Sequence, residues 1–217
     1  MQNISESQIT NNTSFSHLAI AFPISKKTGV SIGMLPYSNI GYELNSRNDE
    51  YNADLMYSGD GGISKVYFGG AYQLSDEISV GANAAYLFGG LNTRKKVVYS
   101  DESFLNSRSN SKINLQGYYY EVGLLYKKNL SENKELTVGV TANNNSEIRV
   151  KRSELIETFE YSGVFELSKD TFVNFTAWGD VTLPQYISVG LTYREGKKLL
   201  LVADYSLQNW EDYRLFN

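Results

Sequence analysis

The sequence contains no cysteine, one histidine (His17) and three prolines among its 217 residues. The lack of cysteine excludes disulfides and thiolate metal sites, and a single histidine excludes a multi-histidine zinc site. The net charge of −4 argues against a nucleic-acid partner, because binding to nucleic acid needs a basic patch. The composition therefore predicts no cofactor and no nucleic acid.

Long apolar stretches are also absent. No run of about 18 apolar residues occurs, so the sequence predicts no transmembrane helix. The first ten residues, MQNISESQIT, are polar and lack the apolar core of a signal peptide. Since an exported protein needs such a signal, we expect the chain either to be cytosolic or to lack the start of its precursor.

Tyrosine, in contrast, is abundant, with 17 residues beside 18 glycines. Many tyrosines and glycines with few prolines are typical of long strands that carry aromatic girdles. The stretch EISVGANAAYLFG (77–89) shows the pattern of such a strand. Every second residue from Ile78 to Phe88 is apolar, whereas the residues between them are small and mostly polar. This two-residue period predicts a strand with two unlike faces.

The same alternation recurs along the chain. It predicts ten strands, at residues 17–22, 30–35, 65–74, 77–89, 117–126, 135–142, 159–167, 172–178, 187–194 and 198–207. Several have about ten residues, the length of a membrane-spanning strand, whereas strands of globular proteins typically have five or six.

The connections between these segments fall into two groups. Short polar connections are expected at PISKKTG, SDE, KKNLSENKE, SKD and REGKK. Longer loops are expected at 40–60, 90–111 and 145–155, and the shorter link WGDVTLP (178–184) is expected at the same end as these loops. Short turns at one end and long loops at the other are the layout of an outer-membrane barrel.

The polar face of the segments indicates which side meets water. It carries the candidate lumen-facing residues Glu121, Glu166, Arg194, Asp204, Asn83 and Tyr119. Burying charged groups in a dry core would cost several kcal/mol each unless they were paired, and a wet lumen removes this cost. We therefore predict an all-β fold, an antiparallel up-and-down transmembrane β-barrel with its apolar face in lipid. A soluble all-β binding protein is the alternative fold.

A family resemblance supports the barrel. The segment LPQYISVGLTYREGKKLLLVADYSLQNWEDY (183–213) resembles the outer-membrane long-chain fatty acid and toluene transporter family. The elements concerned are Leu183-Pro184, Gly190 to Tyr193, and Asp204-Tyr205 to Trp210. The stretches GMLPYSNIGYEL (33–44) and 61–89 look like the versions of this family in Bacteroidota.

The resemblance implies a 14-stranded barrel with an N-terminal hatch, which moves hydrophobic molecules inward. The sequence shows only about ten strands and no hatch, so residues 1–217 are interpreted as one incomplete barrel domain. The hatch and the last strands would be missing, and the family's binding residues cannot be transferred.

Two local motifs suggest other chemistry. GVSIG (29–33) matches the Gly-x-Ser-x-Gly pattern of a nucleophile elbow, with Ser31 as nucleophile and His17 as base. The elbow needs a strand–turn–helix, and here the strand is uninterrupted, so we predict that the chain is not an enzyme. Arg149, Lys151 and Arg152 fall in an expected outer loop, where they could contact lipopolysaccharide phosphates.

These observations predict an outer-membrane barrel for passive uptake of hydrophobic small molecules such as fatty acids. Its partners would be the ligand, outer-membrane lipid and lipopolysaccharide. The alternative function is a barrel component of a protein-secretion or assembly machine, which would have that machine as its partner.

Overall fold

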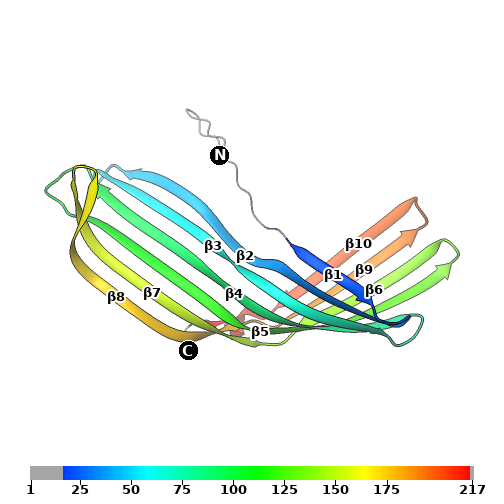
Figure 1. The fold of residues 1–217 in the computed structure, drawn as a ribbon. Coiled ribbons are helices and arrows are strands. Elements are labelled where there is room, and N and C mark those ends of the chain that lie inside the picture. Colours follow the sequence, from blue (N-terminus) through cyan, green and yellow to red (C-terminus); the bar gives the residue numbers. More distant parts are fainter. Residues whose placement is uncertain (1–16, 216–217) are drawn as a thin grey trace.

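The computed structural model describes residues 17–215, which form one antiparallel β-sheet (Figure 1). The strands are β1 (Leu18–Pro23), β2 (Thr28–Asn48), β3 (Ala53–Gln73), β4 (Ile78–Tyr99), β5 (Asn106–Ser131), β6 (Lys134–Asn143), β7 (Ser146–Ser162), β8 (Phe165–Leu183), β9 (Tyr186–Glu195), β10 (Leu199–Gln208) and β11 (Arg214–Leu215). A short 3-10 helix, η1 (Trp210–Asp212), precedes β11. The prediction of an all-β, antiparallel up-and-down fold is confirmed.

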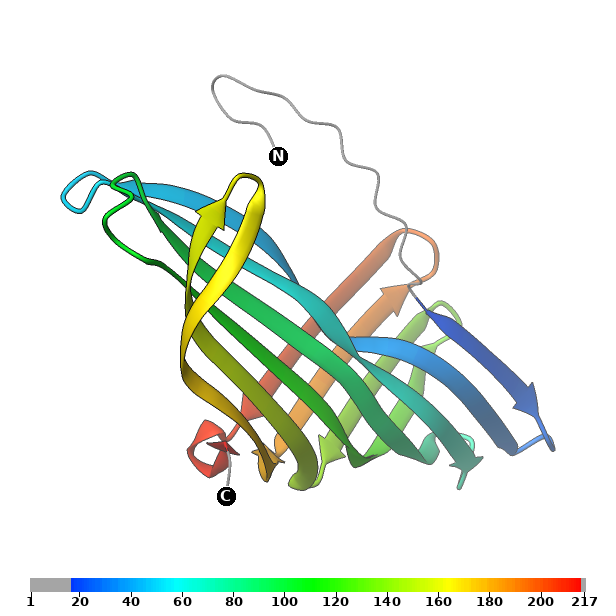
Figure 2. The ribbon, with the colours of Figure 1, turned by 60° about the vertical axis from the view of Figure 1, so that its left-hand side comes forward.

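The sheet is open among the described residues. Its main path runs β1-β2-β3-β4-β5-β6-β9-β10, and the terminal strands β1 and β10 each have one partner. The result is a trough with β1 and β10 at two of its rims (Figure 2). Closure of this sheet into a barrel therefore stays a prediction.

At three positions in the sheet, two strands follow each other end to end, and the three interruptions lie at the same level. β5 pairs with β6 through Glu121–Ser131 and with β7 through Asn106–Gln116, so β6 and β7 lie end to end along the same side of β5. Their break lies at 144–145, the break between β8 and β9 lies at 184–185, and β10 and β11 are separated by 209–213. We call this level the break line.

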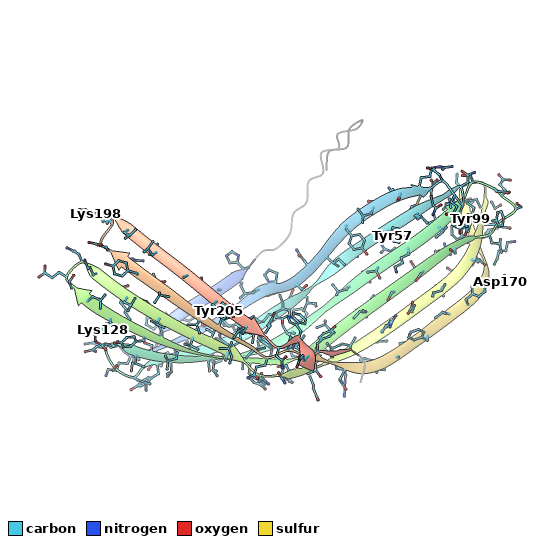
Figure 3. The ribbon with its side chains drawn as sticks, turned by 180° about the vertical axis from the view of Figure 1, so that it is seen from behind. Tyr57, Tyr99, Lys128, Asp170, Lys198 and Tyr205 are labelled. Carbon is cyan, nitrogen blue, oxygen red and sulfur yellow. The ribbon has the colours of Figure 1, made fainter. Side chains whose placement is uncertain are left out.

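The break line divides the sheet into two arms. The basal arm contains β1, β6, β9, β10 and the adjoining parts of β2 to β5, whereas the distal arm contains β7, β8 and the other parts. Figure 3 shows the two arms at an angle to each other, with Lys128 and Lys198 at the basal end and Tyr57, Tyr99 and Asp170 at the distal end.

The two faces of the basal arm differ as the alternation predicts. Tyr118 is 66% exposed, whereas its neighbour Tyr119 is 2% exposed. We call the face with Tyr118 the outer face and the face with Tyr119 the inner face. The outer face of the basal arm carries large apolar side chains, among them Phe68, Val122, Val189, Leu201 and Tyr205.

The small hydrophobic core lies on the inner face at the break line. It consists of Ile63, Ala85, Leu87, Tyr119 and Ile148. Gly117 suits this position, because a Cβ atom would come within 2.7 Å of the Ile148 side chain and 3.1 Å of its Cα, and β7 would have to shift. This close approach lets β7 begin directly against β5 after the break.

The predicted loops require correction. Residues 40–60, 90–111 and 145–155 are mostly strand, and the distal turns are only 49–52, 100–105 and 163–164. SKD (168–170) and most of WGDVTLP (178–184) lie inside β8. The predictions failed because the outer face is polar and charged in the distal arm, so apolar alternation is lost there while pairing continues.

The β7–β8 hairpin turns at Gly163, whose positive φ of 64° favours glycine. Arg149 and Lys151, expected in a loop, lie within β7, and Arg152 forms an ion pair with Glu154. Among residues 17–215, none of the helices has the length and apolar character needed to cross a membrane.

Candidate functional site

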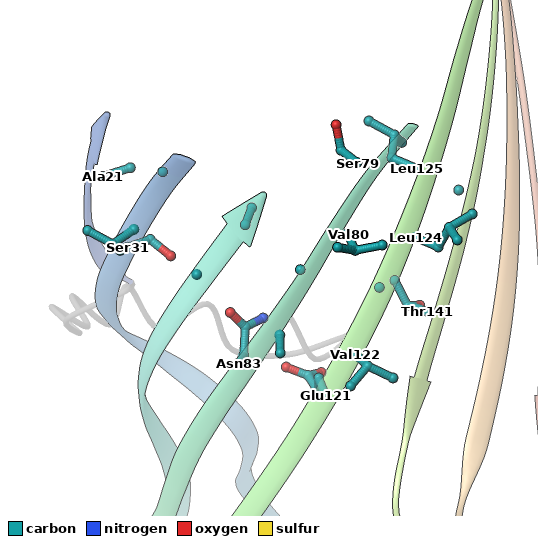
Figure 4. Close-up of a pocket in the computed structure, with 18 of the residues that line it drawn as sticks. Ala21, Ser31, Ser79, Val80, Asn83, Glu121, Val122, Leu124, Leu125 and Thr141 are labelled. Carbon is teal, nitrogen blue, oxygen red and sulfur yellow. The ribbon is translucent and has the colours of Figure 1, made fainter. Parts of the chain in front are cut away.

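The inner face of the basal arm surrounds a cavity of about 720 Å³. Small residues of β1 to β6 form its walls, and its polar groups include Ser31, Asn83, Glu121 and Thr141 (Figure 4). Leu125, several valines and the glycines of these strands also line it. Because small side chains alternate onto this face, the trough keeps an open interior.

Glu121 is the centre of a polar cluster at the distal end of this cavity. Lys65 donates a hydrogen bond from Nζ to Glu121 Oε2 over 3.0 Å, and the Tyr186 hydroxyl donates to Oε1 over 2.9 Å. The side chains of Lys65 and Glu121 are only 14% and 18% exposed. Charge-assisted hydrogen bonds of this kind are stronger than neutral ones, so the cluster ties β3, β5 and β9 together.

Aromatic rings surround the same cluster. Tyr37 packs edge-on against Tyr119 with 5.9 Å between ring centroids, and Lys65 Nζ lies 5.3 Å from the Tyr119 centroid. A second cavity of about 460 Å³ lies here, lined by Tyr37, Glu121, Asn143, Tyr186 and Trp210 among others. The Lys65 ammonium already occupies the cation position beside the aromatic ring.

Asn143 joins the two arms across the break. Its side chain is buried, accepts a hydrogen bond from the Tyr186 backbone N–H and donates one to the Pro184 carbonyl over 3.4 Å. Pro184 lies in the break between β8 and β9, and Tyr186 is the first residue of β9 after it. One amide side chain thus satisfies backbone groups that would otherwise be buried without partners.

The structure gathers some of the predicted site residues. Asn83 pairs directly with Glu121 in the β4–β5 register, and Tyr119 lies on the same face. Asp204 opposite Gly190 and Arg194 opposite Leu200 continue the inner face towards the basal end. Whether this face borders a lumen stays a prediction.

Glu166 is separate from the others. It lies near the distal end, where it pairs with Lys96 and, through its Oε2 atom, with Arg108 Nη1 over 2.6 Å. Arg108 also donates from Nε to Glu157 over 2.6 Å. These side chains share the outer face, because the break after Asn143 and the bulges near Glu157 shift the alternation of β7 and β8.

The ion pairs shift the titration of this distal cluster. The hydrogen bond from Lys96 holds the pKa of Glu166 below its usual range, and Arg108 adds to this effect. Burial opposes the charge on Lys96, but its hydrogen bonds and its attraction to Glu166 raise its pKa overall. Glu166 and Lys96 are therefore both charged near neutral pH.

Sequence reasoning missed three members of the inner cluster: Lys65, Asn143 and Tyr186. The alternation does place Lys65 on the polar face of its strand, which is a usable signal. Asn143 resembles the start of an Asn-rich loop, so its role across the break has no local signature.

Two other chemistries were considered in the sequence. Ser31 lies inside β2, opposite Ala21 and Gly69, in a continuous strand and not in a strand–turn–helix. Within the described part of the chain, no three metal-binding side chains come together. The expectation of no enzymatic activity stays a prediction.

Comparison with known families corrects the predicted relationship. The family model that matches is BamG, and the match covers residues 1–216. No curated protein and no solved structure matched the chain.

The predicted membership of the fatty acid and toluene transporter family is wrong, and with it the interpretation as a porin for fatty acid transport and lipid binding. The motifs misled because alternating strands, glycines and girdle aromatics are required of membrane barrels in general. The match covers nearly the whole sequence, and the chain belongs to the BamG family.

Proposed function

We propose that this chain is a β-sheet component of the outer membrane that associates with the barrel-assembly machinery. The observation that carries the proposal is the BamG match over residues 1–216, since the family name refers to the Bam assembly machinery. The alternative function predicted from the sequence, a barrel component of an assembly machine, agrees with this family. A small-molecule ligand has no such support.

The outer face of the basal arm supports a membrane location. Phe68, Val122 and Tyr205 on this face are 59%, 58% and 65% exposed. A contiguous apolar surface of this extent is unusual for a protein in water. β9 and β10 have 10 residues each, the length that a tilted strand needs to span the hydrocarbon core.

The distal arm supports a role in protein contacts. Its strands continue beyond the apolar band and carry charged residues on the outer face, including Arg94, Lys96 and Arg108. Salt bridges such as Arg94–Asp60 and Arg108–Glu157 link neighbouring strands of this extension. A charged projection beyond the apolar band is suited to contact neighbouring subunits, and the proposed role is therefore that of a scaffold.

Co-purification tests the proposal. The chain would be tagged in its native host, and membranes would be solubilised in a mild detergent. Subunits of the barrel-assembly machinery should be recovered with it in stoichiometric amounts. A tagged outer-membrane protein of similar abundance from another family is the control and should recover none of them.

Depletion of the chain gives a second, functional readout. The level of folded outer-membrane proteins should fall relative to cells that retain the chain. Recovery of the chain without the machinery, or in the soluble fraction, would contradict the proposal.

A further inference from the structure

One edge of β8 in the distal arm has no strand beside it for most of its length. β8 pairs with β7 on one side. On the other side β11 pairs with it only through Arg214–Thr182 and Leu215–Val181. From Val173 to Asp180, no strand of residues 17–215 covers this edge. Alternate residues of this stretch direct their backbone N–H and C=O groups away from β7.

The open stretch, VNFTAWGD, has the properties of a strand that pairs. It contains no proline and no lysine, and the bulges of the β7–β8 ladder lie beyond Val173, towards the hairpin turn. Phe175 and Trp178 are 40% and 62% exposed. Natural sheets protect true edges with lysine, proline or bulges because an unprotected edge recruits another strand. The stretch from Val173 to Asp180 lacks all three.

β11 already shows that this edge accepts a strand. It continues the sheet in antiparallel orientation at the positions directly next to Asp180. On the inner face the open stretch offers Val173, Phe175 and Ala177, and on the outer face Asn174, Thr176, Trp178 and Asp180. An incoming strand with apolar side chains on the inner face, and with polar side chains and one apolar contact to Trp178 on the outer face, would match both faces.

A second copy of this chain fits the edge poorly. In a symmetric antiparallel pair over Val173–Asp180, Phe172 and Thr171 of the second copy would face Val181 and Thr182. Those positions are held by Leu215 and Arg214 of β11. Lipid cannot satisfy a backbone edge either, because acyl chains offer no hydrogen-bonding groups.

We infer that the β8 edge from Val173 to Asp180 binds an extended segment of another polypeptide of the barrel-assembly machinery, by addition of a strand to the sheet. This inference rests on the proposed function and specifies where the partner binds. Backbone hydrogen bonds supply affinity in such complexes, and the alternating side chains supply selectivity.

Site-specific photo-crosslinking in the tagged full chain tests this inference. A photo-reactive residue replaces Asn174 on the open edge. The matched control replaces Ser153, which lies on β7 between β5 and β8. The Asn174 position should form an adduct with a subunit of the machinery, identified by mass spectrometry, and the Ser153 position should form none. In the edge-blocking variant Phe175→Lys, the adduct should fall to the level of the Ser153 control.

Three results would overturn the inference. They are an adduct with a second copy, a crosslink confined to this chain, and no adduct at Asn174 while the machinery still co-purifies. Each of these leaves the proposed function intact. Loss of co-purification from the unmodified chain would instead refute the proposed function, and this inference with it.

Discussion

At the scale of single residues, the clearest interactions are those that the strand breaks and bulges bring together. Glu166 pairs with Lys96 and Arg108 across three strands, and all three side chains are at most 30% exposed. Phe159, the most buried ring of the distal arm, lies beneath the Lys96 ammonium and the Arg108 guanidinium. The ion-paired side chains of Lys96 and Arg108 therefore also cover the buried Phe159 ring.

Removal of the Glu166 charge should weaken the distal hairpin. We expect Glu166→Gln to lower the free energy of unfolding by about 1 kcal/mol, because two partly buried cations lose their shared partner. Denaturant unfolding in detergent measures this loss. Glu102→Gln, in the exposed turn between β4 and β5, is the control and should have no effect. An equal change in the two variants would show that the ion pairs contribute nothing.

The same carboxylate predicts a pH dependence. Its folded-state pKa lies below the usual value of 4.5, so its contribution is complete above that pH and is lost as pH falls through the folded pKa. The unfolding free energy of the wild type should therefore drop faster than that of Glu166→Gln below pH ~4.5. Between pH 7 and 5 the difference between the two proteins should stay constant. A difference that changes in this neutral range would contradict the assignment.

At the scale of elements, the break line determines how the strands are aligned. Asn143→Ala would leave the Tyr186 N–H and the Pro184 carbonyl without their side-chain partner. We expect a loss of about 1–3 kcal/mol, the cost of unsatisfied buried polar groups. Hydrogen exchange at Tyr186 should also speed up. Asn145→Ala, at an exposed position of the same break, is the control. Unchanged exchange at Tyr186 in Asn143→Ala would refute this role.

The break line also explains how far the sequence could predict the elements. In the basal arm one face is consistently apolar, so the alternation correctly grouped every second residue from Ile78 to Phe88 and from Ile187 to Tyr193 on one face. In the distal arm, residues such as Arg94, Lys96 and Arg108 remove this signal although backbone pairing continues. The break at 144–145 then reverses the alternation of β7, and for that reason Glu166 does not share a face with Glu121. Pairing across such a break depends on distant contacts, and no local pattern encodes it.

At the scale of the whole molecule, the two arms meet different environments in the proposed arrangement. The outer face of the basal arm is apolar, whereas the outer face of the distal arm carries ion pairs such as Arg94–Asp60. The inner face of the basal arm carries small and polar side chains and borders the 720 Å³ cavity. This division predicts that the stability lost on substitution by a charged residue depends on which face the residue occupies and not on its position in the sequence.

Two lysine substitutions at the same depth of the basal arm separate lipid from water. Val122 and Thr141 lie on the neighbouring strands β5 and β6, the first on the outer face and the second on the inner face. Val122→Lys should cost about 2–4 kcal/mol if the outer face contacts hydrocarbon, because a lysine at the bilayer midplane is poorly tolerated. Thr141→Lys should be nearly neutral because its side chain points into the open cavity, where water solvates the charge. Folding into lipid vesicles, followed by denaturant titration, measures both values.

Similar small losses in the two variants would mean that both faces meet water, and the membrane location would then be wrong. A large loss confined to Thr141→Lys would mean that the apolar face is covered by protein and that the inner face is packed.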